Sequence, residues 1–155
     1  ERVLAAPEDT EARARVQLGA YFAGVAIENS MLGATHACAN PLTARYGTAH
    51  GEAIAMLLPS VVRWNAPIAA ERYSDLITSS SRSQTAVNGD PSESLARRLE
   101  ELAAAGSLRK TLSDCGVVSD DLGALAAQAA QQWTGGFNPR PFDQSGALEV
   151  YQWAF

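Results

Sequence analysis

The stretch GATHACANPLTARYGTAHG, residues 33–51, contains both histidines of the chain, His36 and His50. They lie fourteen positions apart, with Pro41 and Gly47 between them. Two histidines that bind one metal from a single helix are four residues apart, and this spacing rules that arrangement out. A shared site requires two helices, or a helix and a loop, that bring the imidazoles together. The stretch therefore predicts either two converging segments or two unrelated, hydrogen-bonded structural histidines.

The metal site that this stretch predicts is incomplete. A first-row divalent metal usually takes three or four protein ligands, so two histidines supply about half of the set. Glu28 and Glu52 are available as carboxylates, but no acidic residue has a spacing that marks it as a ligand. Asn40 follows His36 by four residues and shares its face if the helix continues that far. It is a candidate catalytic residue that hydrogen-bonds to whatever His36 binds, or simply a turn residue.

Helical periodicity extends on both sides of residues 33–51. A first helix is predicted to begin near Asp9, whose side chain can cap it, and to end near Ser30. Pro41 is expected to end a short helix at residues 34–39, because proline disrupts a helix interior. A strongly apolar helix, kinked at its proline, is expected at residues 50–65. The middle of the chain therefore reads as several short helices separated by prolines and glycines.

The second half of the chain is also predicted to be helical. Further helices are expected at residues 71–77, 92–105, 120–133 and 145–155, with an exposed loop at residues 78–91. Ser119, Asp120 and Asp121 are expected to cap the helix at 120–133. No segment shows the alternation of β-branched and polar residues that is typical of strands. The fold class is thus all-α, an irregular multi-helix domain.

Composition limits the classes of function. A chain of 155 residues with 46% hydrophobic residues is long enough to form one domain with its own core. Its net charge of −5 and single lysine, Lys110, argue against a nucleic-acid partner. The most apolar segment is interrupted by Pro59 and Arg63, so no membrane partner is expected. Cys38 and Cys115 show no metal-binding or disulfide spacing, which favours reduced thiols and a cytoplasmic location.

Residues 23–65, AGVAIENSMLGATHACANPLTARYGTAHGEAIAMLLPSVVRWN, resemble the C-terminal half of the iron-containing (group III) alcohol dehydrogenases. The tail FNPRPFDQSGALEVYQWAF is similar to the closing Asn-Pro-Arg segment and last helix of that family. The matching positions in the first stretch are Gly33, His36, Ala37, Pro41, Leu42, His50, Gly51, Leu58, Pro59 and Asn65. The resemblance implies the helical C-terminal domain of the dehydroquinate synthase-like/iron alcohol dehydrogenase fold.

The resemblance also implies a ligand set and an activity. In the family, Fe²⁺, or sometimes Zn²⁺, is bound by one Asp and three His, two of which match His36 and His50. The other two precede the stretch at which this chain begins, as does the domain that binds NAD(P). Residues 1–155 are therefore expected to be a single helical domain without its nucleotide-binding partner. The whole enzyme would interconvert an alcohol and an aldehyde or ketone, whereas the isolated chain is expected to be inactive and to bind metal weakly. Residues that bind the nucleotide are not identifiable here.

The resemblance leaves some questions open. Family members often carry a further histidine where this chain has Asn40, so proton relay and substrate preference are expected to differ. There are two alternatives. One is a non-enzymatic interaction module, and the other is an oxidoreductase of the maleylacetate reductase or glycerol dehydrogenase type. An apolar face exposed on the domain would favour homo-oligomers. Arg140 is expected to tie the tail to the body, and Trp64, Trp133 and Trp153 to pack in a core or an interface.

Overall fold

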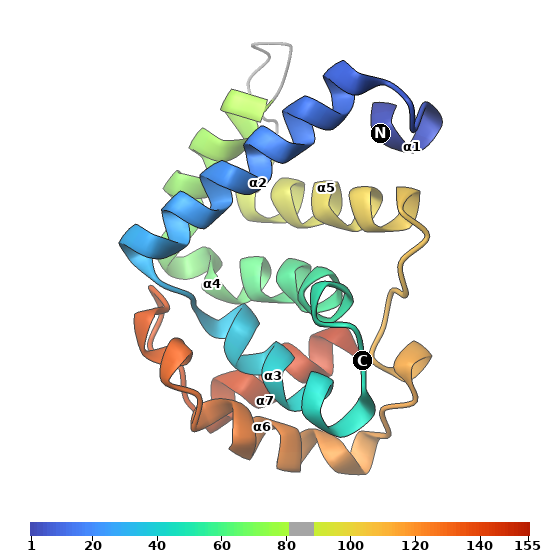
Figure 1. Ribbon diagram of the computed structural model, residues 1–155. Helices are drawn as coiled ribbons and strands as arrows, with labels where there is room; N and C mark the ends of the chain where they lie inside the picture. Colours follow the sequence, from blue (N-terminus) through green and yellow to red (C-terminus); the bar gives the residue numbers. More distant parts are fainter. Residues whose placement is uncertain (81–88) are drawn as a thin grey trace.

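The computed structural model describes residues 1–80 and 89–155, and this part of the chain is helical with no strand (Figure 1). The all-α prediction is confirmed. The helices are α1 (Arg2–Ala5), α2 (Thr10–Ser30), α3 (Ala34–Tyr46), α4 (His50–Ser80), α5 (Pro91–Ala105), α6 (Leu122–Ala130) and α7 (Gln144–Ala154), and the 3-10 turns are η1 (Ser113–Cys115), η2 (Ser119–Asp121) and η3 (Trp133–Phe137).

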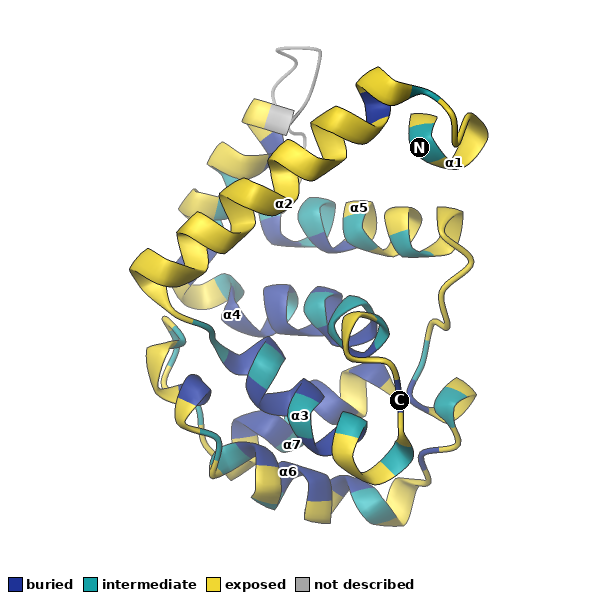
Figure 2. Cartoon of the chain, viewed as in Figure 1, coloured by how far each residue is buried: buried dark blue, intermediate teal, exposed yellow. Residues whose placement is uncertain are grey.

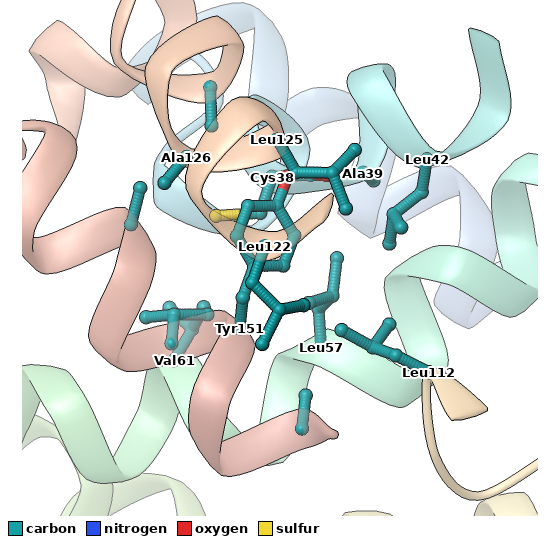
Figure 3. Close-up of a cluster of buried hydrophobic side chains, with 14 of the residues drawn as sticks. Cys38, Ala39, Leu42, Leu57, Val61, Leu112, Leu122, Leu125, Ala126 and Tyr151 are labelled. Carbon is teal, nitrogen blue, oxygen red and sulfur yellow. The ribbon is translucent and has the colours of Figure 1, made fainter. Parts of the chain in front are cut away.

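The main core lies where α3, the first part of α4, α6 and α7 pack together. Figure 3 shows side chains of α6 and α7, including Leu125 and Tyr151, close to Cys38 of α3 and Leu57 of α4. All four of these residues are fully buried. The Tyr151 hydroxyl donates a hydrogen bond of 2.7 Å to the backbone carbonyl of Cys38. The one polar atom of this buried ring therefore has a partner. This core fixes the position of α3 relative to α4.

Two predicted helix ends, one at Pro41 and one near Asn65, are wrong. α3 continues through Pro41 to Tyr46, and α4 continues through Pro59 and Pro67 as one helix of 31 residues. Each proline removes one backbone donor, but burial of an apolar face contributes more to helix stability in a protein than local propensity does. The prolines bend α4: Figure 1 shows its last turns running in a different direction from its first turns.

α4 pairs with α5, and ion pairs join the two helices. The Arg63 guanidinium on α4 donates to Glu93 at 2.7 Å and to Glu100 at 2.6 Å, both on α5. Within the described ranges, α4 is the one helix long and apolar enough to span a membrane, with a mean hydropathy of 1.3. However, 56% of that apolar window is buried inside the fold, as expected for a core helix.

The predicted loop and the predicted cap at Asp121 turn out differently. Residues 78–80 of the expected loop end α4, while residues 81–88 lie outside the described part. Asp121 does not cap α6 with its side chain, because its carboxylate instead accepts hydrogen bonds from Arg45 and from the Tyr46 hydroxyl. That contact ties the end of α3 to the beginning of α6 and explains why the cap is given up.

α2 begins and ends as predicted, but it packs differently from the other long helices. The Asp9 side chain accepts a hydrogen bond of 2.9 Å from the Ala12 amide, which caps the helix. Ala12 is also the one buried residue of α2. Figure 2 shows the rest of α2 exposed, in contrast to the buried faces of α3, α6 and α7. Several large apolar side chains of this helix are solvent-exposed, among them Val16, Leu18, Tyr21, Phe22 and Val25.

Candidate metal centre

The two histidines lie on two different helices that meet. His36 is in the first turn of α3, and His50 is the first residue of α4. Gly47 ends α3 with φ 64°, and its amide donates to the Thr43 carbonyl. Glycine adopts this left-handed conformation without strain. The turn reverses the chain and brings the imidazoles of His36 and His50 together, with ring centres 5.5 Å apart and planes inclined by 50°.

This separation fits two imidazoles that bind one ion. A ring nitrogen lies about 2.1 Å from a bound divalent metal, so two rings in tetrahedral positions around one ion have centres about 5 Å apart. The observed 5.5 Å is close to that arrangement. Among the described residues, no group of three or more His, Cys, Asp or Glu side chains is placed to hold a metal ion. The structure therefore brings together His36 and His50 as a pair, without a third protein ligand from residues 1–80 or 89–155.

The surroundings of His36 favour its neutral imidazole, which is the form that binds a metal. Partial burial lowers the pKa of His36, and the neighbouring His50 lowers it further by charge repulsion. His50 is exposed, so one side of the pair remains open to solvent. Glu28 and Glu52, the acidic residues considered from the sequence, do not join the pair. Glu52 instead binds the Arg109 guanidinium, which holds the pKa of that carboxyl at about 2.

Asn40 is partly buried on α3, one turn after His36. Its side-chain amide donates a hydrogen bond of 2.9 Å to the Gln132 side-chain oxygen. This contact holds the Asn40 side chain, whose position four residues after His36 places the two residues on the same face of α3. Sequence reasoning did not find Gln132, because it lies 92 positions from Asn40 and no local pattern marks it.

Asn138 holds the start of α3 in place. Its side-chain oxygen accepts from the Ala34 amide at 3.3 Å, and its amide donates to Asn65 of α4 and to the Arg140 carbonyl, each at 2.8 Å. Gly33 leaves room for this contact, since a Cβ there would lie 3.1 Å from the Asn138 side-chain oxygen. The Asn-Pro-Arg segment thus fixes the turn of α3 that carries His36.

One further expectation from the sequence is confirmed. Arg140 ties the tail to the body, because its guanidinium donates to the Trp64 carbonyl at 2.5 Å and lies 4.0 Å from the centre of the Trp64 ring. Cys38 packs in the core rather than facing the histidines, and burial raises the pKa of its thiol to about 12. Of the three tryptophans, only Trp64 is in the core. Trp133 and Trp153 are exposed in this chain, so the core half of the expectation does not hold for them and packing in an interface stays a prediction.

A model of the C-terminal region of the Fe-containing alcohol dehydrogenase family matches residues 1–155, the whole chain. The chain belongs to this family. The match covers both histidines, the Asn-Pro-Arg segment and the last helix. It supports iron as the metal of the family, and none of the comparisons supports the zinc alternative.

Individual relatives of the Fe-containing alcohol dehydrogenase family agree with this placement. The chain is 33% identical over 150 residues to lactaldehyde reductase of Escherichia coli K12, covering 95% of this chain and 39% of that protein. It is 28% identical over 155 residues to 1,3-propanediol dehydrogenase of Citrobacter freundii, covering 99% and 40%. A crystal structure of a 1,3-propanediol oxidoreductase superposes with a TM-score of 0.88 at 26% identity, covering 99% of this chain and 41% of that one. The chain thus spans about two fifths of the length of these relatives.

Proposed function

We propose that this chain is the metal-binding helical part of an iron-dependent alcohol dehydrogenase, which interconverts an alcohol and an aldehyde or ketone with NAD(P). The observation that carries the proposal is the pair His36 and His50, whose ring centres lie 5.5 Å apart in a chain that the family model matches throughout. The names of the relatives support the substrate class, since they include lactaldehyde, 1,3-propanediol and long-chain alcohols.

The rest of the enzyme is part of the proposal. This chain covers 40% of one propanediol dehydrogenase, which leaves room for a second domain. We propose that an α/β domain outside residues 1–155 binds NAD(P), and that an Asp and a third His from outside these residues complete the ligand set of His36 and His50. The 155-residue chain alone is then expected to bind iron weakly and to lack dehydrogenase activity.

The roles of the residues follow from their chemistry. His36 and His50 bind through neutral ring nitrogens. Iron held by these two histidines would act as a Lewis acid toward the oxygen of the alcohol or carbonyl, and a bound nicotinamide would supply the hydride chemistry. Asn40 offers its carbonyl oxygen as a hydrogen-bond acceptor beside the histidines, and Gln132 fixes its orientation. Because an amide does not exchange a proton at neutral pH, the alcohol proton leaves through water or through a group other than Asn40.

The proposed cellular setting of the enzyme follows from composition and burial. Reduced, separated cysteines and an acidic chain with a buried apolar helix fit a soluble cytoplasmic enzyme that has neither a nucleic-acid nor a membrane partner. The exposed apolar residues of α2 fit association with a further domain or a second copy.

The proposal is tested on the gene product that contains this chain, loaded anaerobically with Fe²⁺. Alcohol-dependent NADH or NADPH formation is measured for the wild type, His36→Ala and His50→Ala. Each variant removes a direct ligand, so activity is expected to fall by more than the roughly 10–100-fold that changes beyond the direct ligands cause. Arg72→Ala, an exposed change on α4, is the matched control and is expected to keep full activity.

The variant Asn40→Ala distinguishes a role in catalysis from a role in metal binding. It is expected to lower kcat by roughly 10-fold, the size of effect typical of a supporting hydrogen bond, while the iron content stays unchanged. Full activity and iron content in both histidine variants would contradict the proposal. The non-enzymatic interaction module predicts no iron-dependent turnover at all, so the same assay separates the two hypotheses.

A further inference from the structure

Two adjoining cavities between α4 and α5 form a groove, here called the α4–α5 groove. Their volumes are about 470 Å³ and about 310 Å³. Ala55 of α4 and Ala103 of α5 line both cavities, so the two meet at these small side chains. Each volume falls in the range of roughly 300–1,000 Å³ that is typical of small-molecule pockets. His36, Asn40 and His50 line neither cavity.

The smaller cavity is the apolar end of the α4–α5 groove. Glycine, alanine, isoleucine and leucine are the only residue types that line it. Ile54 and Leu58 are four residues apart on one face of α4, and Leu99 and Leu102 line the cavity from α5. Leu102 remains 42% exposed and Leu108, in the connector after α5, 37% exposed. A hydrocarbon chain bound here would remove apolar surface from water on both partners, which is favourable.

The larger cavity is the charged end of the groove. Its charged lining residues are Arg63, Glu100, Glu101, Arg109 and Lys110. The two arginines and the two glutamates each take part in an ion pair of 2.6 to 3.1 Å. Lys110, the single lysine of the chain, is exposed, and its ammonium has no ion pair within residues 1–80 and 89–155. The Asp114 carboxylate accepts from the Lys110 backbone amide rather than from its side chain. The Lys110 charge is therefore free to meet an anion.

The connector after α5 brings the two ends of the groove within reach of one molecule. Leu108 lines the apolar end, and Lys110, two residues later, lines the charged end. Two residues span at most about 7 Å of backbone, so the positions that carry these side chains are close together. A ligand with a short hydrocarbon chain and a charged head can thus contact both ends at once.

We propose that the α4–α5 groove binds a free medium-chain monocarboxylate. Its hydrocarbon chain lies against Leu58, Leu99 and Leu102, and its carboxylate meets the Lys110 ammonium. One uncompensated cation beside an apolar cavity matches a ligand with one negative charge and an apolar tail. A phosphate with more than one charge fits less well, because the Glu100 and Glu101 carboxylates line the same cavity as Lys110 and repel it. The site does not depend on metal binding by the histidine pair.

Isothermal titration calorimetry of octanoate and hexanoate tests the proposal on the gene product that contains this chain. The wild type is expected to bind octanoate at one saturable site. Hexanoate is expected to bind up to about 16-fold more weakly, since each of its two missing methylenes contributes about fourfold. Added NaCl is expected to weaken octanoate binding, because salt screens an exposed charge such as that of Lys110.

Two variants of the groove separate its two ends. Lys110→Met is expected to weaken octanoate binding by about fivefold and to remove its dependence on NaCl. Leu102→Gln keeps the size of the side chain but makes it polar, and is expected to weaken octanoate binding by about 10-fold. Arg72→Met removes one exposed positive charge outside the groove and is the matched control, expected to bind octanoate as the wild type does.

A further variant locates the ligand. His36→Ala is expected to leave octanoate affinity unchanged, and a loss of binding there would place octanoate at the histidine pair and overturn the proposal. Absence of saturable octanoate binding by the wild type also overturns it, as does wild-type affinity in both Lys110→Met and Leu102→Gln at an unchanged melting temperature. Sedimentation with phosphatidylglycerol vesicles without octanoate binding would assign the groove to a membrane surface and would equally contradict a site for a free carboxylate.

Discussion

Helices α2 and α3 are neighbours in sequence and both are rich in small and apolar residues, yet α3 is mostly buried and α2 is almost wholly exposed (Figure 2). α3 packs against α4, α6 and η3, while within the described part α2 makes substantial contact only with the short α1. The difference teaches that helical spacing of apolar residues predicts the helix but not the surface that it meets. The histidine pair lies in the well-packed region of α3 and α4, where neighbouring helices leave the backbone little freedom to move.

The largest expected contrast comes from removing one leucine in each region. Leu57 is fully buried in the core. Leu57→Ala is expected to lower the free energy of unfolding by about 2–5 kcal/mol through lost burial and a cavity. Leu18 on α2 is 52% exposed. Leu18→Ala is therefore expected to change the free energy of unfolding by only about 0.5 kcal/mol or less. Urea unfolding of both variants measures the contrast, and equal losses would show that α2 is packed as tightly as the core.

Two glycines allow the same comparison between α2 and the core, with smaller expected changes in the free energy of unfolding. A Cβ at Gly146 of α7 would lie 2.4 Å from the buried ring of Trp64. Gly146→Ala is therefore expected to cost about 1–3 kcal/mol. Gly19 on α2 has no atom within 4 Å of such a Cβ. Gly19→Ala is expected to stabilise by about 0.5–1 kcal/mol through helix propensity. Opposite shifts in the urea midpoint confirm the prediction, whereas a loss in Gly19→Ala would place a neighbour against α2.

The smallest effect is expected from the ion pairs that join α4 to α5. The Arg63 and Arg97 guanidinium groups hold the pKa of Glu93 at about 2, below its ordinary value of 4.5. The stability that the charged carboxylate contributes is complete above pH 4.5 and is lost as the pH falls toward 2. Glu93→Gln is therefore expected to flatten the loss of stability over this range, by at most about 1 kcal/mol because the pair is partly exposed.

Urea midpoints at pH 7, 4 and 3 measure this change. Glu71→Gln, at an exposed position of α4, serves as the control and is expected to keep the acid dependence of the wild type. A Glu93→Gln variant with the same acid dependence as the wild type would show that the ion pairs of Arg63 are not maintained in solution.

Much of the fold could be predicted from local signals. The cap at Asp9, the proline at the start of α5 and the glycine after it mark helix ends through local hydrogen bonding, and α2, α5 and α7 end close to the predicted residues. The helix through Pro59 was expected, but continuation of α3 through Pro41 and of α4 past Asn65 through Pro67 could not be predicted, because tertiary burial overrides a local cost there. The role of Asp121 was missed for a similar reason, since its partners lie 75 and 76 positions away.

The candidate site was predictable in part. The spacing of His36 and His50 indicated two converging segments, and the structure confirms that two helices meet there. That the pair binds metal, and that Asn40 takes part in catalysis, stay predictions. Gln132 and η3 reach α3 through contacts across the fold, and no pattern within the C-terminal segment predicts these contacts.

The central claim is that His36 and His50 bind one metal ion together, and NMR of their imidazole protons tests it most directly. The chain has only two histidines, so each ring gives its own signals without overlap from others. On titration of the 155-residue chain with Co²⁺, both sets are expected to shift together with one weak dissociation constant, and His36→Gln is expected to weaken the response of His50. Independent responses at different Co²⁺ concentrations, or an unchanged His50 response in His36→Gln, would contradict a shared site.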